Sequence, residues 1–267
     1  MAEASTLEAV LKRDRLIVLA GLVGVATLAW LYLVIMAAAM NMPMAVEGSM
    51  SMGEAMAMPQ IRPWTATDFI LMFLMWAIMM VGMMVPSAAP MILLYARVCR
   101  VQREKGRPFA PTGAFVAGYV AVWSAFSLAA VGLQWALEQA ALLSPMMVST
   151  SPILGGTLLI AAAGYQLSPL KHVCLKHCRG PLDFITRHWR RGTGGAFVMG
   201  ITHGGYCVGC CWVLMGLLFV GGVMNLLWVA AIAFFVLLEK VAPQGELTAR
   251  VGGGALGGAG LVLLLAA

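Results

Sequence analysis

Long apolar runs alternate with short polar segments along the chain. Seven such runs are present: Leu16–Ala39, Phe69–Ala96, Thr112–Leu137, Ser151–Pro169, Gly195–Val220, Gly222–Leu238 and Val251–Ala267. A helix that crosses a bilayer needs about 20 apolar residues, within a range of roughly 17–25. The pattern therefore predicts an all-α fold, a polytopic transmembrane bundle of about seven helices. The last run is short and rich in glycine, so its prediction as a membrane-spanning helix is the weakest of the seven.

Composition supports the same class of protein. Of the 267 residues, 61% are hydrophobic and only 10% are charged, whereas soluble domains carry about 25% charged residues. This apolar excess excludes a soluble globular domain and a disordered chain. The length of the chain and its six cysteines exclude a small disulfide-stapled scaffold.

The basic residues fall on one side of the predicted bundle. All of the 17 Lys and Arg residues except Arg62 lie in segments on the side of the N-terminus. Cytoplasmic loops carry an excess of Lys and Arg, so we expect a cytoplasmic N-terminus and an external C-terminus in a bacterial inner membrane. The net charge of +6 then faces anionic lipid headgroups of the bilayer, and no nucleic acid is expected as a partner.

These patterns divide the chain into five parts. Residues 1–15 are a cytoplasmic segment, and residues 16–39 are an uncleaved anchor, because this run exceeds the roughly 7–15 apolar residues of a signal peptide. Residues 40–67 are an external loop, residues 68–242 are a core of the second to sixth helices, and residues 243–267 are a loop and the seventh helix.

Methionine is concentrated in the external loop and in the helix after it. The loop has Met-x-Met spacings and contains neither Cys nor His; its methionines are Met40, Met42, Met44, Met50, Met52, Met56 and Met58. A thioether is a soft ligand that suits Cu(I), and it cannot be lost to a disulfide in an oxidising compartment. The loop predicts external capture of copper(I). The alternative is a flexible loop whose methionines contact lipid or a partner.

The second apolar run adds seven more methionines, among them the i, i+4 pair Met79 and Met83. Residues with this spacing lie on one side of a helix, which predicts a path for a soft ion, although methionine is also an ordinary filler of apolar helices. Pro86 and Pro90 in the same run predict a kink and a free backbone carbonyl near Gly82.

The fifth run carries metal-ligating side chains at every fourth residue. They are Met199, His203, Cys207 and Cys211, with Cys210 beside them. This spacing places them on one stripe of a helix, and an ionisable residue at bilayer depth marks a functional site. The ligand types favour copper(I), while zinc and iron also use Cys and His. The alternative is a histidine bonded to a neighbouring helix, with cysteines acting as small apolar residues.

A further ligand group lies between the fourth and fifth runs, on the predicted cytoplasmic side. It consists of His172, Cys174, His177 and Cys178. Four potential ligands so close together suit a Cu(I), zinc or iron site, although the spacing matches no zinc-finger pattern. The alternative is a basic amphipathic loop with incidental cysteines.

Four segments occur together in a specific order: MWAIMMVGMMVPSAAPMILLYARV, YQLSPLKHVCLKHCR, HGGYCVGCCWVLMGLLFVGGVMNLLW and LLEK. This combination resembles a family of bacterial integral membrane proteins that carry a domain of unknown function and are described as predicted metal-binding. The resemblance extends from about Trp64 to Ala242 and does not include the methionine-rich loop. It implies metal binding, without naming the metal or a reaction, at Cys174, Cys178, Cys207, Cys210 and Cys211.

These observations predict a copper(I)-handling membrane protein that collects, binds and transfers the ion, with a metallochaperone or subunits of a larger membrane complex as partners. We do not expect an enzyme, and the chain has no nucleotide-binding P-loop. Two alternatives remain open. The Cys207-x-x-Cys210 pair is typical of membrane thiol–disulfide oxidoreductases, but the outer loops hold no Cys. Glycine stripes in the last run would instead suit an accessory subunit of a copper-containing complex.

Overall fold

The computed structural model describes the whole chain except residues 1, 42–62, 106–109, 144–146, 150 and 267. The described residues form helices and no β-strand. The helices are α1 (Ala2–Asn41), α3 (Ala66–Glu104), α4 (Thr112–Gln139), α5 (Pro152–Gln166), α6 (Pro169–Arg179), α7 (Pro181–His188), α8 (Gly192–Gly216), α9 (Leu218–Gly221), α10 (Leu226–Val241) and α11 (Gly245–Leu265).

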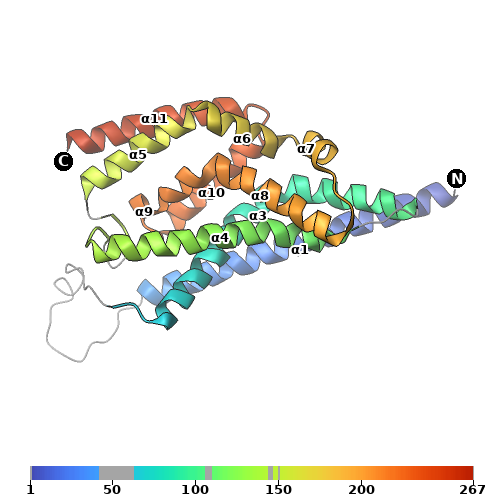
Figure 1. The fold of residues 1–267 in the computed structure, drawn as a ribbon, viewed down its shortest axis with the longest axis horizontal. Helices are drawn as coiled ribbons and strands as arrows, with labels where there is room; N and C mark the ends of the chain where they lie inside the picture. Colours follow the sequence, from blue (N-terminus) through green and yellow to red (C-terminus); the bar gives the residue numbers. More distant parts are fainter. Residues whose placement is uncertain (1, 42–62, 106–109, 144–146, 150, 267) are drawn as a thin grey trace.

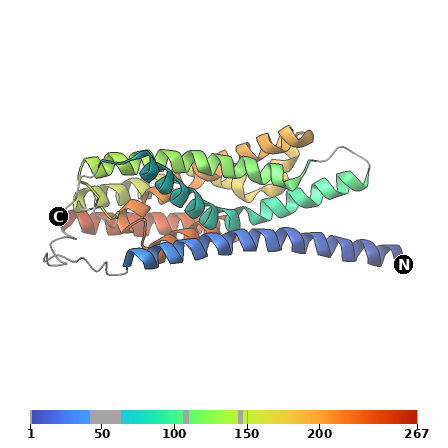
Figure 2. The same cartoon turned by 90° about the horizontal axis from the view of Figure 1, so that it is seen from below.

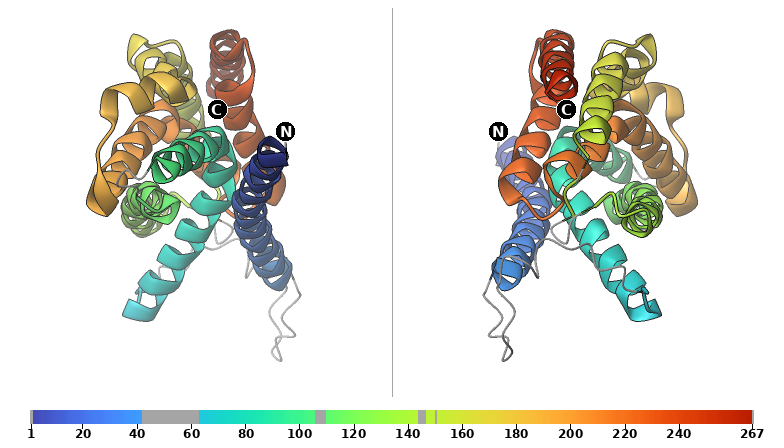
Figure 3. Two further views of the ribbon diagram at one scale, coloured as in Figure 1. Left: turned by 90° about the vertical axis from the view of Figure 1, so that its right-hand side faces the viewer. Right: turned by 90° about the vertical axis from the view of Figure 1, so that its left-hand side faces the viewer.

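The helices form an elongated bundle whose two termini lie at opposite ends (Figure 1, Figure 2). Successive long helices run in opposite directions along the long axis (Figure 1). Seen along that axis, α1 lies at the edge of the bundle (Figure 3), where it packs mainly against α3. Many apolar side chains on the outside of the helices are exposed, such as Leu28, Leu227 and Leu261, as expected of a surface that faces lipid.

Five helical stretches of the described chain are long and apolar enough to cross a membrane: Arg15–Ala39, Ala66–Glu104, Thr112–Gln139, Gly192–Gly221 and Gly245–Leu265. α5 and α6 add a sixth if they count as one span that is bent by 64°. α10 has only 16 residues, fewer than the about 20 that a span usually needs. The all-helical prediction is confirmed. The number of crossings and the orientation of the termini stay predictions.

The segment between the fourth and fifth apolar runs is not a loop, because it forms α6 and α7. The Ser168 hydroxyl accepts a hydrogen bond from the Lys171 backbone N–H at 3.2 Å, and Pro169 is the first residue of the new helix. A serine N-cap followed by proline starts a helix and cannot continue the preceding one. The chain therefore turns after Gln166 and lays α6 against α8.

Proline shapes α3 as the sequence predicts. Pro86 and Pro90 lie inside this helix of 39 residues, which bends along its length (Figure 2). Pro86 has no N–H to donate to the carbonyl four residues earlier. That carbonyl, of Gly82, instead accepts a hydrogen bond from the Trp30 indole of α1 at 3.3 Å.

Glycines allow α4 and α8 to pack backbone against backbone. A Cβ on Gly118 of α4 would collide with the Phe197 carbonyl, and a Cβ on Gly200 of α8 would collide with the Phe115 carbonyl. This is the close approach that small residues permit between membrane helices. It fixes the rotation of α8 and therefore the direction in which its cysteines point.

α5 and α11 pair along one side of the bundle (Figure 1). Gly253 and Gly257 of α11 lie against Gln166 and Ala163 of α5, so this glycine stripe is used within the chain and is not a free docking face. A Cβ added to either of the neighbouring glycines, at positions 254 and 258, would meet no described atom within 4 Å. The use of that second stripe as a docking face stays a prediction.

Candidate metal centre

The predicted ligand stripe of α8 faces the interior of the bundle. His203 is 3% exposed, and the cysteines at positions 207, 210 and 211 are each 1% exposed. The three thiols lie within little more than one turn of helix, because their spacing places them on adjoining positions. The prediction that these side chains share one face of a buried helix is therefore confirmed.

Cys207 lies at the middle of this group. Its sulfur is 3.0 Å from the Tyr119 hydroxyl of α4 and accepts a hydrogen bond from the Lys240 ammonium of α10 at 2.9 Å. Lys240 also donates to the Ser87 hydroxyl of α3 at 3.0 Å. A cation beside a thiol in apolar surroundings stabilises the thiolate, which is the form that binds metals.

Two sulfur pairs flank Cys207. The Cys210 sulfur is 3.9 Å from the Cys178 sulfur of α6, and the Cys211 sulfur is 3.9 Å from the Met84 thioether of α3. The two cysteine groups, which the sequence suggests as separate sites, are thus brought together by the bend between α5 and α6. We call Met84, Cys178, Cys207, Cys210 and Cys211 the sulfur centre.

The distances within the sulfur centre leave room for a soft metal ion between two sulfurs. Two metal–sulfur bonds of about 2.3 Å can span up to about 4.6 Å, so a sulfur–sulfur distance of 3.9 Å accommodates an ion between the pair. Within the described residues, no three His, Cys, Asp or Glu side chains are arranged to hold a metal ion together. Structural zinc is almost always held by four ligands, whereas thiolate and thioether donors select Cu(I).

His203 lies one turn before Cys207 in an aromatic pocket. Its ring is 5.9 Å from the ring of Tyr119 and 5.2 Å from that of Phe184, measured between centroids. Its buried Nδ1 has no hydrogen-bond partner among the described atoms. The bond to a neighbouring helix that the sequence leaves open as an alternative is therefore not seen for this nitrogen in the described part of the chain. A buried nitrogen without a partner suits a ligand.

The other predicted ligands of α6 lie on the same helix as Cys178. His172 and His177 each place Nδ1 near the carbonyl four residues earlier in the chain, at 2.9 and 2.8 Å, which leaves Nε2 as the nitrogen available to a ligand. The His177 ring stacks on Tyr206 of α8 with 4.4 Å between centroids. Cys174 is half-buried and faces Gly209 of α8, where a larger residue would collide with its sulfur.

The predicted methionine ligands divide into three groups. Met79 and Met83 are buried on α3, within two turns of Met84. Met199 is buried near the start of α8, where its sulfur accepts from the Arg190 N–H at 3.3 Å, and no described contact joins it to the sulfur centre. The side chains of the external group, Met40, Met42, Met44, Met50, Met52, Met56 and Met58, lie outside the described residues.

A buried ion pair holds α6 in place. Lys171 of α6 and Glu239 of α10 are 0% and 1% exposed, and their charged atoms are 2.7 Å apart. The Gln166 amide donates to Glu239 at 2.7 Å and accepts from Lys171. Isolated charges at this depth are costly, and paired charges with further hydrogen bonds are tolerated. The cluster anchors the helix that carries Cys174 and Cys178.

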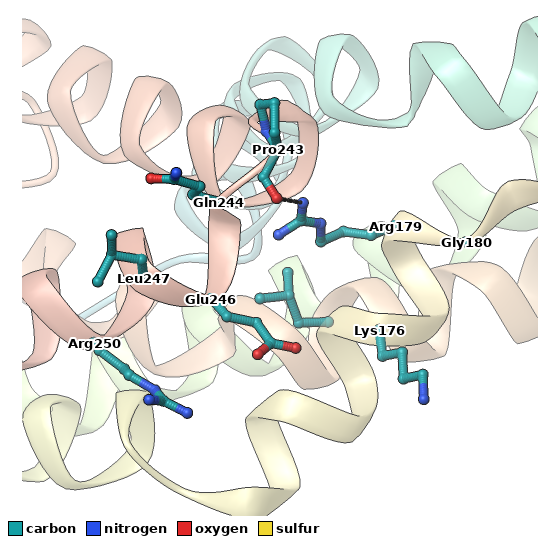
Figure 4. A pocket seen from close by; sticks show the side chains of 9 residues that line it. Lys176, Arg179, Gly180, Pro243, Gln244, Glu246, Leu247 and Arg250 are labelled. Carbon is teal, nitrogen blue, oxygen red and sulfur yellow. Dashed lines mark hydrogen bonds between the residues drawn. The ribbon is translucent and has the colours of Figure 1, made fainter.

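On its other face, α6 borders a pocket of about 610 Å³. The pocket opens between α6 and the turn from α10 to α11, and its charged lining residues are Lys176, Arg179, Glu246 and Arg250 (Figure 4). Arg179 donates to the Pro243 carbonyl at 3.0 Å, which joins α6 to this turn in addition to the ion pair between α6 and α10. None of the candidate metal ligands lines the pocket.

Several groups of the site carry no signal in the sequence pattern. The sequence pattern places Lys240 at the inner membrane interface and Lys171 in a loop. In the structure the half-buried Lys240 reaches the buried Cys207 sulfur, and Lys171 is fully buried. Glu239, the neighbour of Lys240 in the sequence, pairs with Lys171 of α6. Tyr119 belongs to no motif. For Glu239 and Lys240, a pair of charges at the end of an apolar helix is the signal that could have indicated them.

The comparison with known protein families covers this same part of the chain. The family model described as "PpoB2: Copper chaperone" matches residues 73–263, from α3 to α11, and so includes the whole sulfur centre. It does not include α1 or the methionine-rich external segment. No curated protein and no solved structure matches the chain. With most of its length matched and its thiols gathered within that match, the chain belongs to the PpoB2 copper chaperone family and handles copper.

Proposed function

We propose that the protein binds copper(I) at the sulfur centre, inside a membrane, and passes the ion on by ligand exchange. The observation that carries this proposal is the contact between Cys178 of α6 and Cys210 of α8, at 3.9 Å between sulfurs. Membership of a copper chaperone family supports the identity of the cargo. Thiolate and thioether donors support its oxidation state.

The charge of the site supports a monovalent ion. Two thiolates around one Cu(I) leave a single negative charge, which would be costly in the apolar bundle. The Lys240 ammonium, 2.9 Å from the Cys207 sulfur, balances that charge. Lys240 is itself held by Ser87 of α3, so the counter-charge is fixed before an ion arrives.

The different exposure of the cysteines supports one direction of transfer. Cys210 is buried, whereas Cys178 and Cys174 of α6 are half-buried. An ion shared between Cys210 and Cys178 can therefore move towards Cys174 and the surface by replacing one sulfur at a time. Weak and similar successive sites favour such movement over trapping. In this proposal α6 delivers copper to a partner on the cytoplasmic side, either a metallochaperone or a subunit of a membrane complex.

Metal content tests the proposal. The protein is purified in mild detergent under reducing, chelator-free conditions, loaded with Cu(I), and measured by plasma mass spectrometry. The triple variant Cys207→Ser, Cys210→Ser and Cys211→Ser is expected to lose the tightly held copper. The control is Cys99→Ser, which removes a buried thiol of α3 that is not part of the sulfur centre. This control variant is expected to keep the bound copper. Undiminished copper in the triple variant would refute the assignment.

The same samples separate the proposal from thiol–disulfide chemistry. Alkylation followed by mass spectrometry shows whether Cys207 and Cys210 are free thiols that copper protects from the reagent. Protection by copper is expected. A disulfide between these two cysteines in the isolated protein would favour the oxidoreductase alternative instead.

A further inference from the structure

A second cluster of soft and charged side chains lies near the other end of α4. Gln134 is 0% exposed, and its amide nitrogen is close to three acceptors. These are a Glu138 carboxylate oxygen at 2.9 Å, the Met147 sulfur at 3.4 Å and the Met72 sulfur at 3.7 Å. No predicted function accounts for this gathering of two thioethers and a carboxylate around one nitrogen.

The amide cannot satisfy all three acceptors. A glutamine NH₂ group has two hydrogens, and thioether sulfur is a weak acceptor that gains little from an amide. A soft cation at the same place would satisfy the two sulfurs and the carboxylate together. The amide therefore stands where a cation would be held, with its partial positive charge directed at the ligands.

Two tryptophans hold the cluster in position. The Trp76 indole donates to the Gln134 amide oxygen at 2.8 Å, and the Trp64 indole donates to the second Glu138 oxygen at 2.8 Å. Hydrogen bonds from neighbouring groups that orient ligands are a regular feature of metal sites. Here they leave the other Glu138 oxygen on the Gln134 amide nitrogen, which both thioethers also contact.

The backbone of Met147 gives independent support. Its φ is 56°, in the left-handed region that residues other than glycine, asparagine and aspartate rarely adopt. The position nevertheless carries a long side chain. This side chain is 6% exposed, and its sulfur contacts the Gln134 amide nitrogen. A strained residue whose side chain completes a cluster is typical of functional sites.

We infer that Met72, Met147 and Glu138 form an outer site for Cu(I), distinct from the sulfur centre, in which the ion displaces the Gln134 amide from its acceptors. One carboxylate neutralises one monovalent charge, whereas a divalent ion would leave a net charge in apolar surroundings. Met72 and Glu138 are half-buried, so an ion can reach them. This inference deepens the proposed function, on which it rests.

A row of methionines joins the two sites. Met75, Met79, Met80 and Met83 are all buried on α3, between Met72 at the outer site and Met84 at the sulfur centre. The two ends of this row are about 18 Å apart along the helix, and side chains one turn apart are about 5–6 Å from each other. Without thiolates the outer site holds copper more weakly, so the ion moves towards the sulfur centre.

Methionine methyl NMR with Ag(I), a redox-inert soft monovalent ion, tests the inference. The full-length protein is labelled with ¹³C-methyl methionine, and the signals of the key residues are assigned from single Met→Leu variants. Ag(I) is expected to shift the signals of Met72 and Met147 together. Met91, a buried methionine further along α3, is the control and is expected to stay in place. Unshifted Met72 and Met147 signals, while other methionines respond, would overturn the outer site.

The signal of Met84 separates this inference from the proposed function. A Met84 shift without a response from Met72 and Met147 supports the sulfur centre and overturns the outer site. The reverse pattern overturns the sulfur centre and supports the outer site. Glu138→Gln, which keeps an acceptor for Trp64, is expected to weaken the Ag(I) response of Met72 and Met147 at least about tenfold. An unchanged response in that variant would show that the carboxylate is not a ligand.

Discussion

Lys171 and Glu239 join α6 to α10 through an ion pair with charged atoms 2.7 Å apart and almost no solvent exposure. Lys171→Met removes the cation and leaves the carboxylate buried, with Gln166 as its one remaining hydrogen-bond partner among the described side chains. Breaking a buried pair in this way costs about 3–5 kcal/mol. For a protein of this size, 1 kcal/mol corresponds to roughly 2–4 °C in Tm, so the expected fall is about 6–20 °C.

The chain offers a matched control. Arg187 and Asp183 of α7 are also 2.7 Å apart, but their side chains are 70% and 56% exposed. An exposed pair contributes at most about 1 kcal/mol because water and salt screen it, so Asp183→Asn is expected to lower the Tm by no more than about 4 °C. Both variants are followed by circular dichroism in one detergent at one heating rate, because membrane proteins often unfold irreversibly.

A double variant distinguishes charge burial from loss of packing. Lys171→Met combined with Glu239→Gln removes both charges and keeps an amide that can bond to Gln166. We expect it to recover at least half of the lost Tm, since an uncompensated charge is worse than no charge. A double variant that is less stable than Lys171→Met alone would refute this reasoning, as would equal effects of Lys171→Met and Asp183→Asn.

Three further perturbations test other parts of the structure. Gly200→Leu forces a side chain into the Phe115 backbone and should lower the unfolding free energy in detergent by about 1–3 kcal/mol or more. The control is Gly216→Ala, whose new methyl group meets no described atom within 4 Å, and it should raise the unfolding free energy by up to about 1 kcal/mol. Lys240→Met should weaken Cu(I) affinity at least about tenfold in competition with a chelator, and Lys240→Arg should recover part of it. Trp30→Phe removes the donor to the Gly82 carbonyl and should cost about 1 kcal/mol in the same unfolding assay.

The helices and the effect of proline on α3 could be predicted from the sequence because they depend on local rules. Apolar run length predicts where helices form. The missing N–H of Pro86 predicts the free Gly82 carbonyl, which the structure shows with Trp30 as its donor. The spacing of four residues between His203, Cys207 and Cys211 predicts one stripe on a helix, and the structure shows all three side chains buried.

The meeting of the two cysteine groups could not be predicted in the same way. Cys178 and Cys210 are brought within 3.9 Å by the bend at Ser168 and by the rotation of α8 that its glycine contact with α4 imposes. Both are tertiary effects that hydrophobic periodicity does not encode. For the same reason Lys171, which the sequence pattern places in a loop, is a buried anchor.

Residues without a motif are the hardest to find from the sequence. Gln134 and Met147 belong to no pattern, since an amide in an apolar run and a methionine in a connecting segment are both common. Their significance depends on distances of 3.4 to 3.7 Å between the amide and the sulfurs. Such contacts become visible only once the helices are placed.

X-ray absorption at the copper edge, on reduced protein loaded with one equivalent of Cu(I), is the most decisive experiment for the sulfur centre. We expect a coordination shell made up mainly of sulfur, and we expect this shell to be lost when Cys207, Cys210 and Cys211 are replaced by Ser. A shell made up mainly of nitrogen or oxygen, or a sulfur shell that persists in the triple variant, would contradict copper binding at the sulfur centre.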